Sequence, residues 1–332
     1  MIISRTPFRV SLFGGGTDYP AWYRDNGGSV IGMTIDKYCY LSVRYLPPFF
    51  KHKHRIVWSN IELVDSIDEI QHPAVRAILK EKEFNTGLEI AYNADLPARS
   101  GLGTSSSFSV GLINALNALK GRMSSKKELA DEAIRIEQNV MLESVGSQDQ
   151  VWAAHGGFNK ISFNSDGSYE VSPLLMPNKQ RKELLGSFML FFTGFSRFSG
   201  ELAEKQIANF KNKNKELNLI NDFTSNAGKI LQENAEVVTN LGHLMHEGWQ
   251  IKRELAQGVS TPEIDEIYKA GIEAGAIGGK LLGAGGGGFM LFIVEPEKQI
   301  AVRNRLEKFI HVDFDLESDA SKIIVFDPND VA

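Results

Sequence analysis

Several things that this chain lacks narrow the range of its functions. Its 332 residues include one cysteine, Cys39, so no disulfide can form within the chain and no cysteine-based metal centre is expected. A single cysteine in a chain of this length is typical of a protein from a reducing compartment. No uninterrupted apolar run approaches the ~20 residues that span a bilayer, and no basic segment followed by an apolar one stands at the N-terminus. We therefore expect a cytoplasmic protein without a membrane partner.

An excess of positive charge is also missing. The chain has 36 Lys and Arg against 41 Asp and Glu, a net charge of −5, so we expect no nucleic-acid partner. The seven histidines show no metal-ligand spacing beyond the loose pair His52 and His54. The remaining composition, 42% hydrophobic and 23% charged, is typical of a globular protein, and the length suggests two domains.

Strand and helix signals mix along the whole chain, which predicts an α+β fold. Apolar runs predict strands at 2–13, 29–35, 38–46, 55–58, 88–94, 158–163, 188–193, 289–294 and 322–326. Helices are predicted over 108–119, after a capping box at Ser125 and Glu128, through most of 200–258, from Thr261 onward and over 296–309. The polar stretch 165–181 separates two expected domains, 1–175 and 176–332.

The most informative stretch is the 97–107 loop, Pro-Ala-Arg-Ser-Gly-Leu-Gly-Thr-Ser-Ser-Ser, which runs directly into a predicted helix. Gly101 and Gly103 allow tight backbone turns and close approach of a ligand. The unpaired first-turn N–H groups and the dipole of a helix favour a bound anion. It is not a Walker A loop, because no Gly-Lys-Ser/Thr follows. The pattern predicts a phosphate-binding loop; an ordinary loop with a serine-rich helix cap is the alternative.

A second glycine-rich segment lies near the N-terminus. A predicted strand carries Arg9 and ends in Gly14, Gly15 and Gly16, followed by Thr17 and Asp18. The glycines let backbone approach a ligand, and the Asp18 carboxylate can accept hydrogen bonds from two sugar hydroxyls. A tight turn with a solvated aspartate explains the pattern equally well.

Two carboxylates follow the 97–107 loop. Glu137 lies beside the apolar stripe of a predicted helix, and Asp149 follows the turn Gly146-Ser147-Gln148. A carboxylate that faces a phosphate loop can hold magnesium. A second one can take a proton from a hydroxyl group or orient it for attack. In isolation, a surface helix with an aspartate cap accounts for the same residues.

Residues 283–288, Gly-Ala-Gly-Gly-Gly-Gly, form a third glycine-rich segment, here called the glycine loop. Four consecutive glycines cost conformational entropy on folding, so a close approach to another loop or to a ligand is expected. A flexible hairpin loop is the alternative.

Together these segments resemble the GHMP kinase superfamily, named for galactokinase, homoserine kinase, mevalonate kinase and phosphomevalonate kinase. Its three motifs occur here in the family order, with Thr104 in place of the first serine of Gly-Leu-Gly-Ser-Ser. Glu137 and Asp149 are 12 residues apart (149 − 137), as in the galactokinase-like members. The resemblance covers nearly the whole chain. It implies a two-lobed fold with a ribosomal protein S5 domain 2-like N-terminal lobe and a ferredoxin-like C-terminal lobe.

The resemblance also implies ATP and Mg²⁺ as cofactors and assigns roles residue by residue. Asp149 would orient and deprotonate the acceptor hydroxyl, and Arg9 would offset charge on the migrating phosphoryl group. Ser105 and Glu137 would hold Mg²⁺. Sugar hydroxyls would be recognised by Gly15, Gly16, Thr17 and Asp18. The ATP phosphates would be bound by Pro97, Ser100, Gly101, Leu102, Gly103, Thr104, Ser105 and Ser106, with Gly285 and Gly286 from the glycine loop.

Within the superfamily, the strings at 13–20, 146–150 and 155–159 resemble the D-glycero-D-manno-heptose 7-phosphate kinase group. Gly14 to Gly16 stand where galactokinases have Gly-Glu-His, which argues against galactose. The resemblance implies phosphorylation of the anomeric hydroxyl of a heptose 7-phosphate to the 1,7-bisphosphate, for nucleotide-heptose synthesis.

Three alternatives stay open from the sequence. One is a kinase of an unphosphorylated sugar such as fucose, and one is a non-catalytic sensor with the same fold. The third, an RNA-binding module, is disfavoured by the net charge. A phosphorylated acceptor needs further cations, for which Arg197 and the cluster 51–55 are candidates, although a solvated loop explains the cluster slightly better. Monomer and homodimer are both compatible with the sequence.

Overall fold

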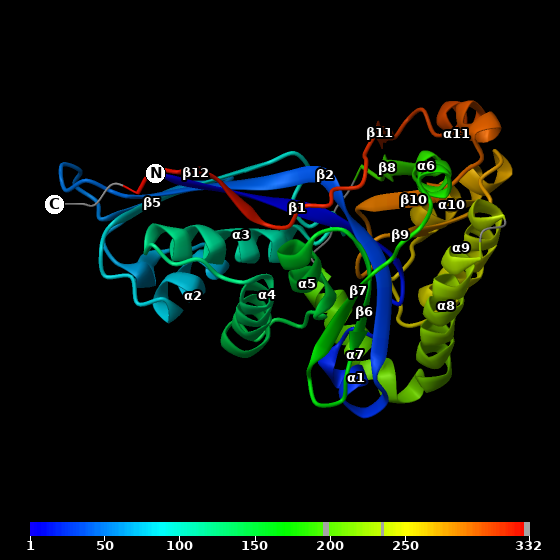
Figure 1. The fold of residues 1–332 in the computed structure, drawn as a ribbon, viewed down its shortest axis with the longest axis horizontal. Helices are drawn as coiled ribbons and strands as arrows, with labels where there is room; N and C mark the ends of the chain where they lie inside the picture. The colour runs from blue at the N-terminus through cyan, green and yellow to red at the C-terminus, as the bar shows by residue number, and fades with distance from the viewer. Residues whose placement is uncertain (195–198, 234–235, 329–332) are drawn as a thin grey trace.

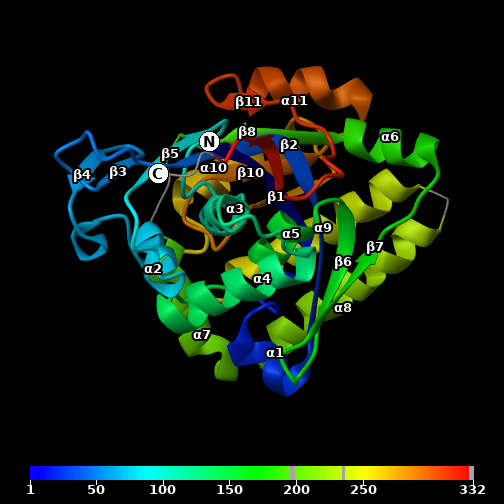
Figure 2. The same ribbon diagram turned by 60° about the vertical axis from the view of Figure 1, so that its left-hand side comes forward.

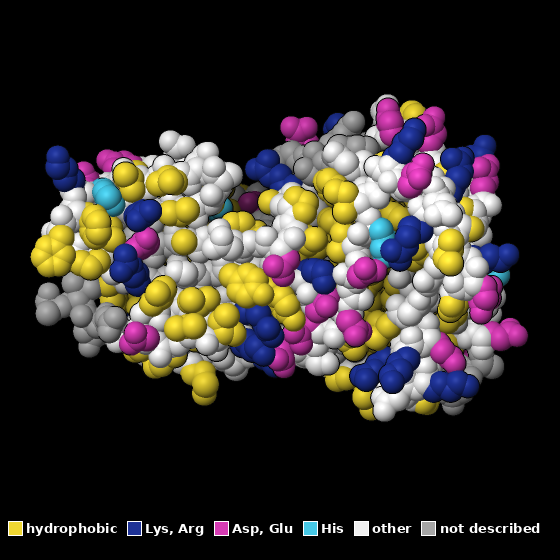
Figure 3. All heavy atoms as spheres, turned by 90° about the horizontal axis from the view of Figure 1, so that it is seen from above, with side chains coloured by type: hydrophobic (Ala, Val, Ile, Leu, Met, Phe, Trp, Pro, Cys, Tyr) yellow, Lys and Arg dark blue, Asp and Glu magenta, His cyan; other side chains and the backbone are white. Residues whose placement is uncertain are grey.

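The computed structural model describes residues 1–194, 199–233 and 236–328. Two β-sheets, each covered by helices, lie side by side along the long axis of the molecule (Figure 1). The expected α+β class is therefore confirmed. Among the described residues, no helix combines the length and the apolar composition needed to cross a bilayer. On the face shown in Figure 3, Lys and Arg side chains are interspersed with Asp and Glu rather than gathered in one basic field.

The larger sheet has the strand order β12-β1-β2-β5-β3-β4, and β6 pairs with β2 and with β7. Neighbours are antiparallel except for the parallel pair β3 and β5. Its strands are β1 (Ile2–Phe13), β2 (Gly28–Tyr45), β3 (His54–Val57), β4 (Ile61–Val64), β5 (Leu88–Ala94), β6 (Phe158–Phe163), β7 (Tyr169–Pro173) and β12 (Lys322–Phe326).

The two separate strands predicted at 29–35 and 38–46 are one strand, β2. Its register against β1 shifts where Pro7 pairs with Tyr38 and Phe8 pairs with Ile35. Asp36 and Lys37 form the resulting bulge, which bends the strand without ending it. The gap between the two predicted strands is therefore a bulge inside a continuous strand.

Helices cover one face of the larger sheet (Figures 1 and 2). They are α2 (Pro73–Glu81), α3 (Thr104–Leu119), α4 (Lys126–Arg135) and α5 (Gln148–His155), while α1 (Pro20–Asn26) follows β1. The capping box that begins α4 is confirmed, because Ser125 and Glu128 each accept a hydrogen bond from the other's backbone N–H. Helix α3 begins four residues earlier than predicted, because Gly103 adopts a left-handed φ of 71° as its N-cap.

The smaller sheet consists of β8 (Phe188–Phe192), β9 (Gly278–Leu281), β10 (Phe289–Ile293) and β11 (Ile310–Val312), in the antiparallel order β11-β8-β10-β9. Helices connect its first strand to its second and its third to its fourth, which is the ferredoxin-like arrangement. These and the neighbouring helices are α6 (Asn178–Gly186), α7 (Ser199–Asn209), α8 (Asn214–Gln232), α9 (Val237–Arg253), α10 (Pro262–Glu273) and α11 (Gln299–Arg305). Thr261 caps α10 as predicted, whereas α11 is shorter than the predicted 296–309.

The two lobes are joined at both the sheet and the core. Strand β12 returns from the C-terminal region to pair with β1, so Ile2 lies opposite Phe326. The predicted second domain thus contains one strand of the first lobe's sheet. One hydrophobic cluster also includes side chains from both lobes, among them Val10 and Leu12 of β1, Met245 of α9 and Leu291 of β10. Because strand side chains alternate, Arg9 and Ser11 point to the opposite face of β1.

Candidate active site

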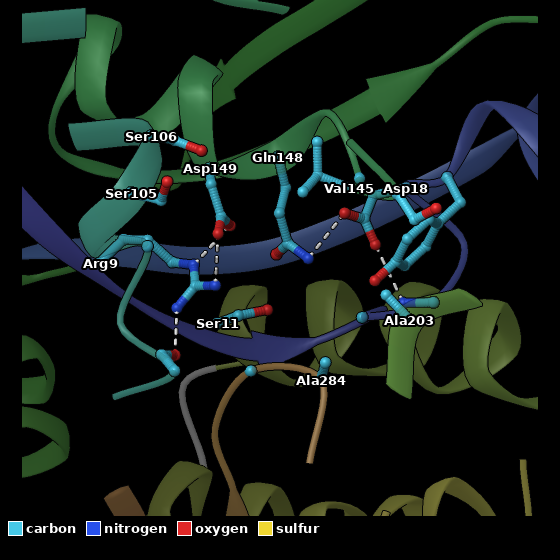
Figure 4. Close-up of a pocket in the computed structure, with 18 of the residues that line it drawn as sticks. Arg9, Ser11, Asp18, Ser105, Ser106, Val145, Gln148, Asp149, Ala203 and Ala284 are labelled. Carbon is cyan, nitrogen blue, oxygen red and sulfur yellow. Dashed lines mark hydrogen bonds and ion pairs between the residues drawn. The ribbon is translucent and has the colours of Figure 1, made fainter. Parts of the chain in front are cut away.

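A cleft between the lobes gathers most of the candidate residues (Figure 4). One wall is built from the end of β1, the turn after it, the 97–107 loop and the start of α5. The cleft is also lined by Ala203 of α7, Lys252 of α9 and the first two residues of the glycine loop. Segments that are far apart in the chain therefore meet at one site.

The predicted pair Arg9 and Asp149 lies at the centre of this cleft. Arg9 Nε and Nη2 donate to the two carboxylate oxygens of Asp149 at 2.7 and 2.8 Å, and Nη1 donates to the Gly101 carbonyl at 2.5 Å. The Arg9 side chain is 5% exposed and that of Asp149 is 25% exposed. Asp149 is in the first turn of α5, where the helix dipole favours a carboxylate. The pair is thus rigidly held, with one carboxylate edge open to the cleft.

The 97–107 loop has the geometry of an anion site. A side chain on Gly103 would come within 3.1 Å of Arg9 Cγ, and its left-handed backbone favours glycine as well. The first backbone bond of α3 comes from Ser107 N–H to the Gly103 carbonyl, so the N–H groups of the preceding turn face the cleft without a helical partner. They are suited to bind negatively charged oxygens.

The glycine loop packs directly on the 97–107 loop, as expected. A Cβ atom on Gly283 would lie 2.6 Å from Gly101 Cα, and one on Gly288 would lie 2.3 Å from the Ser100 carbonyl oxygen. Gly285 and Gly286 instead pack on Val259, whose carbonyl accepts from Gly286 N–H at 3.1 Å. Gly283 and Ala284 line the cleft in place of the predicted pair, because the loop turns away after them.

Glu137 lies behind the first turn of α3, on a single π-helical turn at Ile136–Val140. Its Oε2 accepts from Ser106 Oγ at 2.9 Å and from Gln150 Nε2, whereas its Oε1 is buried and has no hydrogen-bond partner among the residues that the structure describes. Burial raises the pKa of this carboxyl to about 7. The structure therefore places Ser106 next to Glu137, while the predicted metal partner Ser105 lies exposed on the cleft.

The turn after β1 presents Gly15, Gly16 and Asp18 to the cleft. Asp18 is buried, accepts from Gly16 N–H at 2.9 Å and from Gln148 Nε2 at 2.8 Å, and its pKa is raised chiefly by burial. The prediction that Thr17 contacts a sugar is corrected. Its fully buried hydroxyl lies within hydrogen-bond distance of the Gly14 and Ser29 carbonyls, which share its single proton, and it accepts from Ser29 N–H, so it holds the turn together.

The other predicted residues take varied positions. Thr104 Oγ1 accepts from Arg99 N–H, and Leu102 is a core residue. The Ser100 hydroxyl is buried and has no hydrogen-bond partner within the described ranges. Pro97 is exposed and outside the cleft lining. Residues 51–55, of which the last two begin β3, are also absent from that lining. Arg197 lies outside the described residues.

Sequence reasoning missed several side chains of the cleft, among them Ser11, Gln148 and Lys252. Burial lowers the pKa of Lys252 to about 8. Each had a signal: Ser11 shares the Arg9 face of β1, Gln148 precedes Asp149, and Lys252 occupies the apolar stripe of α9 that contains Met245 and Trp249. Lys280, outside the cleft lining, reaches from β9 to the carbonyls of Ser11 and Leu12 and so fixes the end of β1.

Comparison with known proteins gives a consistent result. Residues 70–157 match the GHMP kinases N terminal domain, and residues 231–311 match the GHMP kinases C terminal family. The D-glycero-alpha-D-manno-heptose 7-phosphate kinase of Campylobacter jejuni is 30% identical over 321 residues, which are 92% of this chain and 93% of that protein. The L-fucokinase/L-fucose-1-P guanylyltransferase of Bacteroides fragilis is 28% identical, over 92% of this chain and 36% of that longer protein.

Solved structures agree on the fold. A D-glycero-D-manno-heptose 1-phosphate kinase from Bacteroides thetaiotaomicron has a TM-score of 0.78 at 24% identity, covering 97% of this chain and 98% of that one. The galactokinase of Lactococcus lactis in complex with galactose has a TM-score of 0.74 at 18% identity, covering 97% and 94%. Family models, sequence relatives and fold thus point the same way, and the chain belongs to the GHMP kinases.

Proposed function

We propose that this chain transfers the γ-phosphoryl group of ATP to the anomeric hydroxyl of a heptose 7-phosphate. The observation that carries the proposal is the Arg9–Asp149 pair held against the 97–107 loop at the cleft. Phosphoryl transfer depends on positioning and charge neutralisation more than on covalent help. The Arg9–Asp149 pair can position the acceptor and neutralise charge, and it lies beside the start of α3, where an anion would bind.

Asp149 is the group that would receive the acceptor hydroxyl. Its partly exposed carboxylate accepts the hydroxyl proton while the sugar oxygen forms its bond to the γ-phosphorus. The bond from that phosphorus to the bridging oxygen of ADP then breaks, and ADP leaves. Arg9 keeps the carboxylate in place through two bonds and brings positive charge next to the migrating group.

The residues behind the loop fit a divalent cation. Glu137 has one buried carboxylate oxygen without a partner in the described part of the chain, and Ser106 contributes a hydroxyl beside Glu137. Oxygen donors of this kind suit Mg²⁺. Glu137 and a serine of the first turn, Ser105 or Ser106, would hold the ion. When bound, Mg²⁺ neutralises charge on the nucleotide phosphates.

The identity of the acceptor rests on the relatives and on the cleft chemistry. The Campylobacter jejuni heptose 7-phosphate kinase aligns over nearly the whole of both chains, which supports a heptose 7-phosphate here. The Bacteroides fragilis fucokinase relative favours an unphosphorylated sugar as the second candidate. Asp18 and the backbone of Gly15 and Gly16 offer polar contacts to either type of sugar.

An ADP-release assay with Mg-ATP distinguishes these candidates. The panel is D-glycero-D-manno-heptose 7-phosphate, mannose, galactose and fucose, with Asp149→Asn as the matched inactive variant. We expect the highest kcat/KM with the heptose phosphate and a bisphosphate product in the ³¹P NMR spectrum. Preference for fucose would replace the proposed acceptor, and ATP binding without ADP release from any sugar would indicate a sensor rather than an enzyme.

A further inference from the structure

Three polar side chains that the sequence did not single out converge on Gly15. A Cβ atom at Gly15 would lie 3.4 Å from Lys252 Nζ, 3.9 Å from Gln148 Nε2 and 3.9 Å from Ser11 Oγ. They come from α9, α5 and β1, so both lobes contribute. Figure 4 shows Gln148 and Ser11 in the space between the Arg9–Asp149 pair and Asp18.

These groups are buried but incompletely hydrogen-bonded. Ser11 is 4% exposed, and Gln148 and Lys252 are each 8% exposed. Ser11 Oγ and Gln148 Oε1 have no hydrogen-bond partner among the described residues. Lys252 Nζ donates to the Gly283 carbonyl at 2.8 Å, which uses one of its three N–H groups. Because buried polar groups are nearly always satisfied, a ligand is expected here.

The pattern of donors and acceptors defines the ligand. Lys252 can only donate, the Gln148 Oε1 can only accept, and the Ser11 hydroxyl can do both. A sugar hydroxyl also donates and accepts, so it matches this set, whereas an ionised phosphate only accepts. The nearby carboxylates of Asp18 and Asp149 disfavour a phosphate further.

We infer that Ser11, Gln148 and Lys252 form a subsite that binds adjacent hydroxyl groups of the acceptor sugar, with Gly15 leaving room for them. The inference rests on the proposed sugar-kinase function and deepens it. Lys252 is a specificity-determining residue that contacts the acceptor and not the nucleotide. The terminal phosphate of the acceptor, where it has one, lies outside this subsite.

Two variants test the subsite from different directions. Lys252→Met removes the cationic donor, and Gly15→Ala fills the space with a methyl group. Gly15 does not have a positive φ and its added Cβ makes only ordinary contacts, so alanine is tolerated by the backbone. The matched controls are Lys229→Met on the exposed face of α8 and Gly186→Ala, which has open space around it.

We expect Lys252→Met to raise the KM for the acceptor by roughly 10- to 100-fold, the effect of losing a hydrogen bond to a charged group. Gly15→Ala should raise the same KM, because its methyl group occupies the space that the sugar needs. The KM for ATP should stay within about twofold, and both controls should match the wild type. Lys252→Arg retains the charge and should recover part of the acceptor affinity. Thermal melting of every variant identifies any that fail to fold.

Acceptors that lack single hydroxyl groups give the decisive readout. In the wild type, removing a hydroxyl that the subsite binds lowers kcat/KM, and in Lys252→Met the same removal should have no further effect. Independent, additive losses at every position would overturn the inference. So would a raised KM for ATP with an unchanged KM for the acceptor.

Failure of the proposed function would look different, because the wild type itself would release no ADP with any sugar. The subsite is then tested by titration calorimetry with heptose 7-phosphate and with mannose. Weaker binding by Lys252→Met and Gly15→Ala would support it, and unchanged affinity in both variants would refute it.

Discussion

Replacing Glu137 with glutamine should change how the stability of this protein depends on pH. Glu137 is fully buried, and its pKa is raised from its ordinary value of 4.5 to about 7, chiefly by burial. The folded protein therefore binds a proton more tightly than the unfolded chain does between these two values. Stability contributed by this group is present below pH 4.5, falls as the pH rises towards 7 and then stays constant.

The size of the effect follows from the pKa. Each tenfold change in proton affinity corresponds to ~1.4 kcal/mol, so ionising Glu137 costs the fold about 3 kcal/mol above pH 7. Glutamine never ionises. Its amide oxygen can accept from Ser106 and Gln150 as Oε2 does, and the cost of its unpaired NH₂ group is the same at every pH. The test therefore compares the unfolding free energies of Glu137→Gln and the wild type, and asks how the difference between them changes with pH.

Guanidinium unfolding in EDTA at pH 5 and pH 8 measures this quantity. Relative to the wild type, Glu137→Gln should gain about 2 to 3 kcal/mol between the two pH values, because the unfolded carboxyl is already mostly ionised at pH 5. Glu128→Gln is the control, because hydrogen bonds from Ser125 lower the pKa of Glu128 and place its titration below this range. If the stability difference between Glu137→Gln and the wild type were equal at pH 5 and pH 8, ionisation of Glu137 would not destabilise the fold and the reasoning would be wrong.

Three further outcomes are expected. Asp149→Asn should lose turnover and keep ATP affinity, as measured by ADP release and by calorimetry; equal turnover would exclude proton transfer to Asp149. The acceptor KM of the wild type should rise above a pH of about 8, where Lys252 loses its charge, and that of Lys252→Arg should stay flat; parallel profiles would contradict a role for this charge. Ser125→Ala should cost ~1 kcal/mol of unfolding free energy without changing either KM, since it removes only the cap of α4.

The features that depend on local chemistry could be predicted from the sequence alone. The left-handed turns at Gly101 and Gly103, the helix start after them and the strand that carries Arg9 are set by neighbouring residues. The α+β class could likewise be predicted, because strand and helix patterns are local and mix along the chain. The packing of the glycine loop on the 97–107 loop was also expected, because a run of glycines indicates a close approach. The resemblance to the GHMP kinases rested on the same local motifs.

Contacts between distant segments were decided only by the tertiary structure. Helix α3 turns Ser106 rather than Ser105 towards Glu137, which depends on where the helix begins and how it packs. The Thr17 hydroxyl is occupied by hydrogen bonds with Gly14 and Ser29, so it is not available to a ligand. Lys252 becomes a cleft residue because α9 packs beside the end of β1, where burial changes its pKa. Which side chains meet across the two lobes depends on how the helices and strands pack, and a local sequence pattern contains no information on that packing.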